Sequence, residues 1–434
     1  MVGILADGLA PATLSTLYLS HECHPMSLPS AAVRENASET APAAGQPFTL
    51  KPILFAYMCG TMAMMAFVAI IGPLSRQLGL APWQAGVGVT VSGVLWMLLS
   101  PLWGRLSDRR GRRAILLVSF SGVCVCCCAL AGWLTLAMHV PMAVWQVFAG
   151  MVLTRGGIGG FYAAVPTVSQ ALIADRMPPE QRVAALAALG AVNGVGLVVG
   201  PALAGQLTRF GLEAPLFLTA WLPLLALGVL WKYLKPSPVV GPEQGEVPRL
   251  LDPRLRRPMA AAFTAMLTVA IGQIVVGFFA IDRLGMSSGE AARTAGLALT
   301  SVGVGLVLSQ LVVRRIRWHP GLMIRMGMVV AGLGFGAVLL VSDSVMLMGC
   351  HFVVAFGLGF VFPSFSAMAA NAVQPHEQGA AAGSVGAAQG LGNVLGPLAG
   401  TLLYEVSPLL PYVLAAALLL VVAGWVGRRP RPAA

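Results

Sequence analysis

The chain contains 434 residues, of which 57% are hydrophobic and 10% are charged, and its formal net charge is +11 at pH 7. Soluble domains are roughly 45–50% apolar, so this composition, with a mean hydropathy of +0.81, excludes an ordinary soluble globular protein. The basic residues are scattered over short polar segments, which argues against a nucleic-acid-binding surface.

Continuous apolar runs follow one another along most of the chain. A membrane-spanning helix needs about 20 apolar residues, and backbone groups inside a bilayer must hydrogen-bond within their own segment, so each long run is predicted to be a helix. Alternation of the kind found in barrel strands is absent from the runs. The sequence therefore predicts an all-α membrane protein with twelve transmembrane helices, at 53–75, 84–103, 114–136, 141–163, 183–206, 214–233, 259–281, 290–312, 320–341, 345–369, 380–403 and 407–427.

The segments outside these runs are polar. Residues 1–50 mix Ser, Ala, Pro and Glu and are predicted to form a disordered N-terminal tail, and 428–434 form a short C-terminal tail. A stretch rich in Pro and charge predicts a linker at 234–258, which separates helical segments 51–233 and 259–427. Most of the 27 Lys and Arg residues lie on the side of the tails and the linker, so both termini are predicted to be cytoplasmic.

A charged cluster, GRLSDRRGRR, begins at Gly104 between the second and third runs. Gly104 and Gly111 permit a tight turn and close backbone approach. Asp108 is predicted to accept hydrogen bonds from Arg109 or Arg112, or to face the helix N-terminus at the start of the eleventh run. Because an acid does not help positive-inside placement, we predict that these five residues form a conformational latch on the cytoplasmic side.

The fifth and eleventh runs repeat each other at an offset of 196 residues. Four glycines and a proline coincide at this register: Gly190 with Gly386, Gly194 with Gly390, Gly196 with Gly392, Gly200 with Gly396, and Pro201 with Pro397. The repeat predicts two pseudo-symmetric six-helix bundles joined by the linker, an arrangement found in transporters whose halves rock about a midplane site.

Three motifs resemble elements of the major facilitator superfamily. GRLSDRRGRR fills every fixed position of that family's loop signature, and LTRGGIGG resembles its R-x-x-x-G element. GLVVGPALAG resembles the glycine–proline element of drug–proton antiporters. The R-x-x-x-G element consists of Arg155 and Gly159. The glycine–proline element consists of Gly196, Gly200, Pro201 and Gly205. The resemblance covers about 52–427 and implies alternating access in twelve helices, most like the bacterial drug–proton antiporter branch.

The sequence departs from this family pattern at two places. The loop at 313–321 keeps its basic residues but has no acid that matches Asp108, and Ala204 stands where the antiporter element usually has a second glycine. The glycines of that element either serve close packing alone or shape a bend that seals a leak path between the halves.

Arg155 is the charge deepest within a predicted span. An arginine there costs roughly 2.5–3.5 kcal/mol on insertion scales, so we expect it to face the bundle interior with a partner. The acids lie outside the span centres. Arg155 therefore either bonds to polar groups such as Gln170 or Asn193, or meets an anionic substrate, or takes part in proton transfer.

Two further residues are candidates for proton-linked transport. His351 has a suitable intrinsic pKa, although a histidine within a span is often simply packed. Asp282 lies at the end of the seventh run, where an ion pair with Arg283 is the alternative. Asp108 and Asp175, at the predicted cytoplasmic face, are the other candidate acids for this role.

The family resemblance places the substrate cavity among the first, fourth, seventh and tenth spans. Met and Phe provide adaptable apolar surfaces there, although ordinary helix packing explains each of them equally well. The scarcity of acids disfavours a strongly cationic substrate relative to a neutral or anionic one. The candidate cavity residues are Tyr57, Met58, Thr61, Met65, Gln273, Phe278, Phe356 and Phe360.

These patterns predict a secondary active transporter of a bacterial cytoplasmic membrane, monomeric and without cofactor. We expect proton-coupled export of a drug or of a metabolite such as a siderophore. An importer or facilitator is the alternative, and a membrane sensor or scaffold is the alternative from another class. The sequence contains no known enzyme motif and no P-loop, so catalysis is not predicted. The cysteines of VCVCCC point in different directions around one helix and cannot converge on one ion, so a metal site is not predicted.

Overall fold

The computed structural model describes residues 49–235, 252–313, 315–316, 318–374 and 377–426. The predicted tails at 1–50 and 428–434 and most of the predicted linker lie outside these residues, apart from Thr49 and Leu50 at the end of the first tail.

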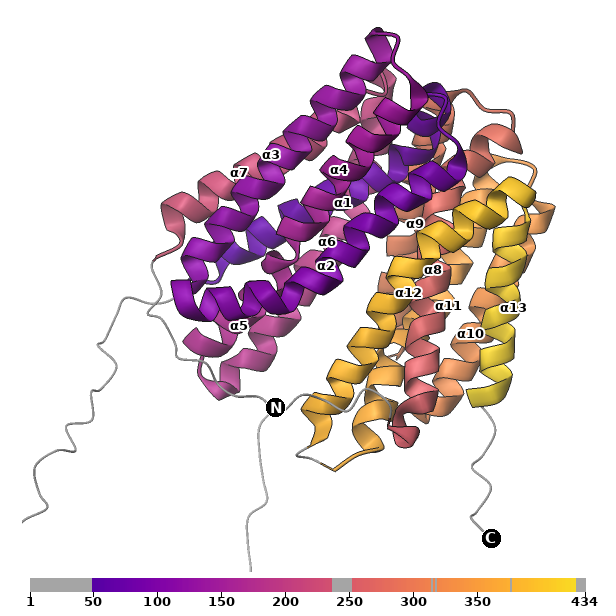
Figure 1. The fold of residues 1–434 in the computed structure, drawn as a ribbon. Coiled ribbons are helices and arrows are strands. Elements are labelled where there is room, and N and C mark those ends of the chain that lie inside the picture. Colours follow the sequence, from indigo (N-terminus) through magenta and orange to yellow (C-terminus); the bar gives the residue numbers. More distant parts are fainter. Residues whose placement is uncertain (1–48, 236–251, 314, 317, 375–376, 427–434) are drawn as a thin grey trace, which may run out of the picture. The chain divides into compact units, whose positions relative to one another are not determined.

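Every element of the described chain is helical, and the helices follow one another with short connections (Figure 1). They are α1 Lys51–Gln77, α2 Pro82–Arg110, α3 Arg112–His139, α4 Val144–Tyr162, α5 Ala164–Arg176, α6 Pro179–Leu207, η1 Thr208–Phe210, α7 Ala214–Tyr233, η2 Pro253–Leu255, α8 Arg256–Asp282, α9 Ser288–Val313, α10 Pro320–Ala337, η3 Val338–Leu340, α11 Ser344–Asn371, α12 Gln378–Val406 and α13 Leu410–Val426.

Ten helices within the described residues are long and apolar enough to cross a membrane. All twelve predicted runs coincide with helices, but the last two differ from the others. The α12 helix has 29 residues but carries the side-chain amides of Gln389 and Asn393 in its apolar part, and α13 is strongly apolar but only 17 residues long. An all-helical membrane fold is therefore confirmed.

Local sequence explains where several helices begin and end. Asp343 caps α11 by accepting a hydrogen bond from the Met346 backbone N–H at 2.8 Å. Ser287 and Glu290 form a reciprocal capping box before α9, since Glu290 Oε2 accepts from the Ser287 backbone N–H at 3.0 Å. Gly79 and Gly285, with φ of 68°, follow the ends of α1 and α8, where a residue with a Cβ would be strained.

The GRLSDRRGRR cluster is helical almost throughout, which corrects the prediction of a loop. The α2 helix continues through Arg110, Gly111 alone interrupts it, and α3 begins at Arg112. Gly111 has a φ of 88°, so its lack of a Cβ permits the sharp turn. Gly104 lies within α2, where an added Cβ would meet only Thr167 at an ordinary 3.5 Å, so close backbone approach is not its role here.

The predicted fourth span, 141–163, coincides with α4, but a further helix, α5, continues directly after a break at Ala163, where no span was predicted. Pro166 explains the break, because a proline has no N–H to donate to the carbonyl of Tyr162 and its ring crowds that carbonyl. The predicted start of the second helical segment also shifts, since 253–258 are helical rather than part of a linker.

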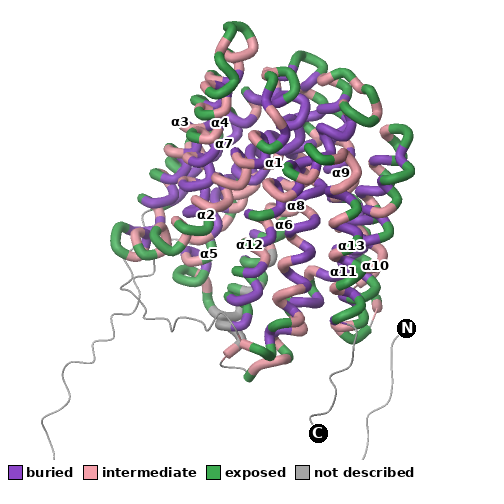
Figure 2. The backbone as a smooth tube through the Cα atoms, turned by 45° about the vertical axis from the view of Figure 1, so that its right-hand side comes forward, coloured by how far each residue is buried: buried purple, intermediate pink, exposed green. Residues whose placement is uncertain are grey.

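We refer to the helices of 51–233 as the first half and those of 253–426 as the second half; in Figure 1 they run from indigo to magenta and from orange to yellow. The α1 helix packs mainly on α6 and α7, and α8 packs mainly on α12 and to a lesser, equal extent on α13 and α1. These two are central: 72% of the α1 span and 78% of the 253–282 span are buried, against 22% for α2. Figure 2 shows the exposed residues concentrated on outer helices and on loops.

The halves meet at one end of the helices, which we call the contact end. There α1 and α8 finish side by side, so that a Cβ added at Gly72 would lie 2.8 Å from the Phe278 backbone nitrogen. The start of α2 meets the end of α12 where Thr90 donates to the Val394 carbonyl at 3.0 Å. The end of α6 meets the start of α9, where Thr208 lies 3.4 Å from the Gly289 carbonyl. These hydrogen bonds between described residues of the two halves all lie toward this end.

Candidate functional site

A cavity of about 60 Å³ lies between the halves, just inside the contact end. Its apolar wall comes mostly from α1 and α2, and its polar groups come from α2, α4, α8 and α12. None of the described lining residues is acidic. The polar members are Ser92, Arg155, Gln273 and Asn393, and the apolar members are Met64, Met65, Val68, Val89, Gly93, Trp96, Ala270, Ile274 and Pro397.

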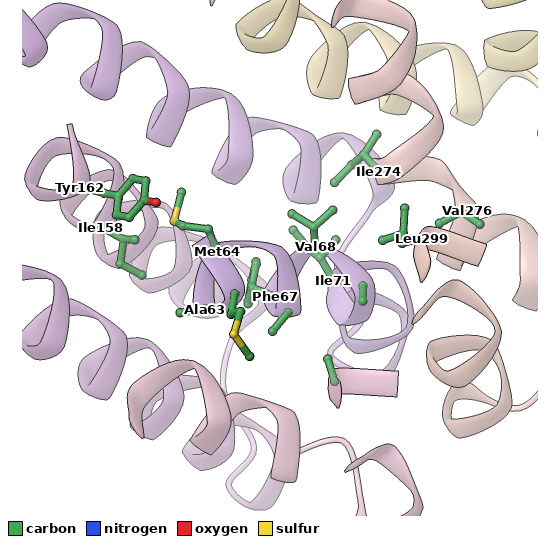
Figure 3. Packing of buried hydrophobic residues seen from close by; sticks show 14 of the residues in the cluster. Ala63, Met64, Phe67, Val68, Ile71, Ile158, Tyr162, Ile274, Val276 and Leu299 are labelled. Atoms are coloured by element: carbon green, nitrogen blue, oxygen red, sulfur yellow. The ribbon is translucent and has the colours of Figure 1, made fainter. Parts of the chain in front are cut away.

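The helix α1 forms the floor of this region. Figure 3 shows Met64 on the side of Ile158 and Tyr162 from α4, and Val68 and Ile71 on the side of the second half. The α1 residues therefore touch both halves. Trp96 packs edge-on against Tyr162, with ring centroids 5.6 Å apart, so the indole is fixed at the cavity wall.

Arg155 on α4 is buried, with a relative exposure of 2%. Its guanidinium carbon lies 4.6 Å from the centroid of the Phe67 ring, which is a cation–π contact. Its Nε has no hydrogen-bond partner among the described residues. Arg155 also lines a second cavity of about 10 Å³ beside Cys127 and Thr219, which has room for about one water molecule.

The polar partners expected for Arg155 are wrong. Gln170 is exposed on α5. Asn193 on α6 instead accepts a hydrogen bond from the Thr61 hydroxyl at 2.9 Å, and that hydroxyl lies 2.9 Å from the hydroxyl of Tyr162. Arg155 makes no ion pair or hydrogen bond with any residue that the structure describes, so its charge faces the two cavities.

The predicted cavity residues divide into three groups. Met65 and Gln273 line the cavity. Thr61 is buried in the network with Tyr162 and Asn193 and does not line it. The others lie elsewhere: Tyr57 and Met58 are half-buried on α1, Phe356 and Phe360 pack on each other along α11 with ring centroids 5.4 Å apart, and Phe278 is fully buried.

Most of the lining residues were missed in the sequence, and among them are the polar or aromatic side chains of Ser92, Trp96 and Asn393. Asn393 had a usable signal, because it is a side-chain amide in an otherwise apolar glycine-rich run. Ser92 and Trp96 had none, since small hydroxyls and aromatic rings are common in such helices. Their selection depends on which face α2 turns toward the second half.

Asp282, the last residue of α8, joins the two halves at the contact end. It forms an ion pair with Arg76 of α1 at 2.5 Å and accepts a hydrogen bond from the Tyr404 hydroxyl of α12 at 3.0 Å. The expected alternative, a pair with Arg283, is therefore wrong. Phe278 lies below this cluster, with the Arg76 guanidinium 5.5 Å from its ring centroid, so it belongs to the contact between the halves.

His351 is buried within the second half. Its Nδ1 lies 2.9 Å from the Leu347 carbonyl, and its ring meets Tyr412 of α13 edge-on at 6.4 Å between centroids. Neither His351 Nε2 nor the Tyr412 hydroxyl has a hydrogen-bond partner among the described residues. His351 is thus separate from the cavity between the halves.

The five predicted latch residues lie at the end opposite the contact end, which we call the charged end. Arg112 is 8% exposed and bonds to Asp108 at 2.5 Å and to Asp175 of α5 at 2.8 Å. Arg109 is exposed. The described contacts of Asp108 stay within the first half and do not reach the start of α12. The second half has its own cluster, in which Arg254 bonds to Asp252 at 2.7 Å and to Glu377 at 2.9 Å.

Replacement of Arg112 by methionine is expected to destabilise the protein by about 1–3 kcal/mol, because it leaves two half-buried carboxylates without their shared donor. Thermal unfolding of the purified protein in detergent measures the effect. Arg109→Met is the matched control, since Arg109 is exposed and its loss is expected to change stability by less than about 0.5 kcal/mol. Equal unfolding temperatures for the two variants would refute the structural role of Arg112.

The glycines of the antiporter-type element lie at close helix contacts. A Cβ at Gly200 would lie 2.5 Å from the Met62 carbonyl oxygen, and one at Gly196 would lie 2.8 Å from Thr61. Pro201 is inside α6. Gly205 approaches the other half, since its Cβ would lie 3.1 Å from Gly296 of α9. The element therefore packs α6 on α1 and then on α9.

The fold and the cavity define a helical membrane transporter. The chain belongs to the Major Facilitator Superfamily, whose profile matches residues 53–332 and 289–434. It is similar to the tetracycline resistance protein, class G, of Vibrio anguillarum, with 27% identity over 361 residues that make up 79% of this chain and 87% of that protein. It is also similar to the tetracycline resistance protein, class C, of Escherichia coli, with 28% identity over 354 residues that make up 77% of this chain and 85% of that protein.

Solved structures share the fold at low sequence identity. The human organic anion transporter MFSD10 superposes with a TM-score of 0.61 at 18% identity and covers 87% of this chain and 98% of its own. A bacterial homologue of the iron transporter ferroportin in an inward-facing state gives a TM-score of 0.68 at 16% identity, with 88% and 98% covered.

Proposed function

We propose that this protein is a secondary active transporter that exports a small organic compound, a drug or a metabolite such as a siderophore, in exchange for protons. The observation that carries this proposal is the cavity between the halves. It lies beside a set of contacts that are confined to one end of the helices. A site that is covered at one end only is what alternating access requires, since rocking the halves exposes it to the other side.

The same proposal includes twelve spans in two pseudo-symmetric six-helix bundles, 51–233 and 259–427. Equivalent glycines of the repeat support it. Gly196 and Gly200 pack on α1, and their counterparts Gly392 and Gly396 pack on α8, where a Cβ would lie 2.5 Å from the Phe263 carbonyl oxygen and from the Ala270 Cβ, respectively. Helices α12 and α13 complete the count.

We place the charged end and both termini in the cytoplasm of a bacterium, with the protein as a monomer in the inner membrane. The arginines at 105–113 and 254–257 support this orientation through the positive-inside rule. The structure then corresponds to an inward-facing state. In the opposite state Asp108 is proposed to face the start of α12 and to act as the latch.

Export of a drug is proposed because the relatives include tetracycline resistance proteins, and proton coupling is proposed from the resemblance of 196–205 to the antiporter element. Asp282, His351 and Asp108 are the proposed proton-linked groups. Asp282 is the strongest of them, because its carboxylate joins α1, α8 and α12, and neutralising it removes the ion pair that holds the halves together. Protonation of Asp282 is therefore coupled to opening of the contact end.

The direct test uses everted vesicles from a host that lacks its own drug pumps. Tetracycline and other antibacterial compounds are first screened by growth inhibition, with and without Asp108→Asn. Vesicles energised with a proton gradient are expected to accumulate the exported compound, and an uncoupler is expected to abolish accumulation. Accumulation that is insensitive to the uncoupler would remove proton coupling from the proposal.

An importer or facilitator of a metabolite is the second candidate function. The observation in its favour is that none of the described cavity-lining residues is acidic, so the site itself lacks a carboxylate that would exchange a proton for the substrate. Right-side-out vesicles decide between the two. Uptake in that orientation, without accumulation in everted vesicles, supports import and contradicts export.

A further inference from the structure

The charge of Arg155 is not compensated by the protein that surrounds it. An arginine at the centre of a span costs roughly 2.5–3.5 kcal/mol on insertion scales, whereas a cation–π contact returns about 0.5–2 kcal/mol. The Phe67 ring gives the guanidinium a cation–π contact, the Cys127 thiol is its other electrostatic neighbour among the described residues, and Arg155 Nε is left without a hydrogen-bond partner there. A structural role alone would favour a neutral side chain at this position.

The guanidinium faces a cavity that is chemically suited to a negative charge. Gln273 of α8 and Asn393 of α12 bring amide groups from the second half, and Ser92 of α2 brings a hydroxyl that has no hydrogen-bond partner in the described part of the chain. These groups can donate hydrogen bonds, and no described lining residue carries a negative charge. A cationic group would be repelled by Arg155, and a neutral group could accept its hydrogen bonds but would leave its charge uncompensated.

The size of the cavity limits what it holds. About 60 Å³ accommodates only a few water molecules, far less than the roughly 300–1,000 Å³ that encloses a drug-sized ligand. It therefore suits an anionic head group. The apolar wall formed by Met64, Met65 and Trp96 fits the first part of a hydrophobic body, which extends from there toward the charged end.

We propose that Arg155, with Gln273 and Asn393 across the interface, binds the carboxylate of an amphipathic monoanion with an aromatic or aliphatic body. A carboxylate matches the planar fork of the guanidinium with two parallel hydrogen bonds. Arg155 belongs to the first half and the two amides belong to the second half. Such an anion therefore bridges the halves at the cavity between them. This inference names the substrate class of the transporter and rests on the proposed function for its link to transport.

The test compares two probes of the same shape that differ in charge, 2-naphthoate and 2-naphthamide, by calorimetric titration of the purified full-length protein in neutral detergent. Wild type is expected to bind naphthoate at least about 10-fold more tightly than naphthamide, since hydrogen bonds to a charged group are worth about 10- to 100-fold in affinity. Arg155→Gln is expected to weaken naphthoate by that factor and to leave naphthamide within about twofold.

Matched variants keep the result interpretable. Arg325→Gln removes another arginine within a span, one that is exposed on α10 and absent from the cavity lining, and it is expected to bind naphthoate as wild type does. If Arg155→Gln does not fold, the test uses the wild-type comparison of the two probes together with two other variants. Gln273→Leu and Asn393→Leu are each expected to weaken the binding of naphthoate severalfold.

Equal affinity of wild type for the two probes, or no binding of naphthoate, overturns the anion site. Naphthoate binding that survives Arg155→Gln does so too. The outcome is independent of the vesicle experiment: if transport fails there while naphthoate binds in the Arg155-dependent way, the export proposal falls and the anion site stands.

Discussion

Replacing Gly159 by alanine is expected to lower the free energy of unfolding by more than about 3 kcal/mol and to abolish most of the folded protein. A Cβ at this position would overlap the carbonyl oxygen of Ser92 and would lie 2.6 Å from its carbonyl carbon. Both are backbone atoms of α2, so the clash is relieved only by moving one helix away from the other. Overpacking by one group typically costs about 1–3 kcal/mol when side chains can adjust, and here they cannot.

This prediction also explains the R-x-x-x-G spacing. Positions four apart lie on the same face of a helix, so Gly159 lets α4 approach α2 on the face that carries Arg155. Ser92, which Gly159 contacts, lines the cavity that Arg155 faces. Any Gly159→Ala protein that is recovered is therefore expected to bind 2-naphthoate more weakly than wild type.

Gly132→Ala is the matched control for this experiment. Gly132 is exposed on α3, and a Cβ there would meet nothing within 4 Å. Its substitution is expected to leave stability unchanged or to raise it slightly, because alanine favours a helix over glycine by about 1 kcal/mol. Folded yield and unfolding temperature in detergent are the measurements, and a Gly159→Ala protein as stable as the control would contradict the packing argument.

The sequence is informative about helices and backbone contacts for a simple physical reason. Length and hydropathy of the apolar runs suffice to predict helices in a membrane, and all twelve runs became helices. Glycine matters through the absence of an atom, so its effect is readable without knowing the neighbours in detail. Accordingly the repeat glycines Gly200 and Gly396, matched by register alone, both lie at close helix contacts, Gly200 against Met62 of α1 and Gly396 against Ala270 of α8.

Side-chain partners were much harder to predict. Asp282 pairs with Arg76, 206 residues away, rather than with the adjacent Arg283, because α1 and α8 end side by side and the chain neighbour points elsewhere. Phe278, expected in the cavity, is buried one turn before Asp282 on the same contact. Successive residues of a helix point about 100° apart around its axis, so the orientation of α8 decides whether Phe278 faces the cavity or the contact with α1. The hydropathy of an all-apolar run does not determine that orientation.

The same limit applies to charge at the helix ends. The sequence indicated that Asp108 has a role beyond membrane orientation, but not that Arg112 would hold it together with Asp175 of α5. That arrangement requires the break at Ala163, which brings the last turns of α5 under the α2–α3 junction. At the charged end the described ion pairs thus stay within each half, while at the contact end Asp282 bridges the halves.

The difference between the two ends suggests a role for those glycines of the repeat that make no close contact in this structure. Gly190 on α6 and Gly386 on α12 occupy equivalent positions, and a Cβ at either would meet nothing within 4 Å. Another matched pair of the repeat, Gly200 and Gly396, lies ten residues further along the same two helices and is tightly packed. If rocking reverses which end is closed, the free glycines are the positions at which the halves approach next.

The double substitution Gly190→Leu with Gly386→Leu is accordingly expected to fold normally and to transport poorly. In the present state two leucines occupy open space, so the free energy of unfolding should change by less than about 0.5 kcal/mol. In the opposite state they overpack the closing surface by about 1–3 kcal/mol each, so the pair lowers the population of that state by about 30-fold or more. Initial rates of transport of the compound identified in everted vesicles should fall by a similar factor.

Gly228→Leu is the matched control. Gly228 is exposed on α7, and a Cβ there would meet nothing within 4 Å, so this variant should keep both stability and transport. Wild-type transport by the stable double variant would mean that the halves do not close at the charged end, and alternating access between these two ends would have to be abandoned.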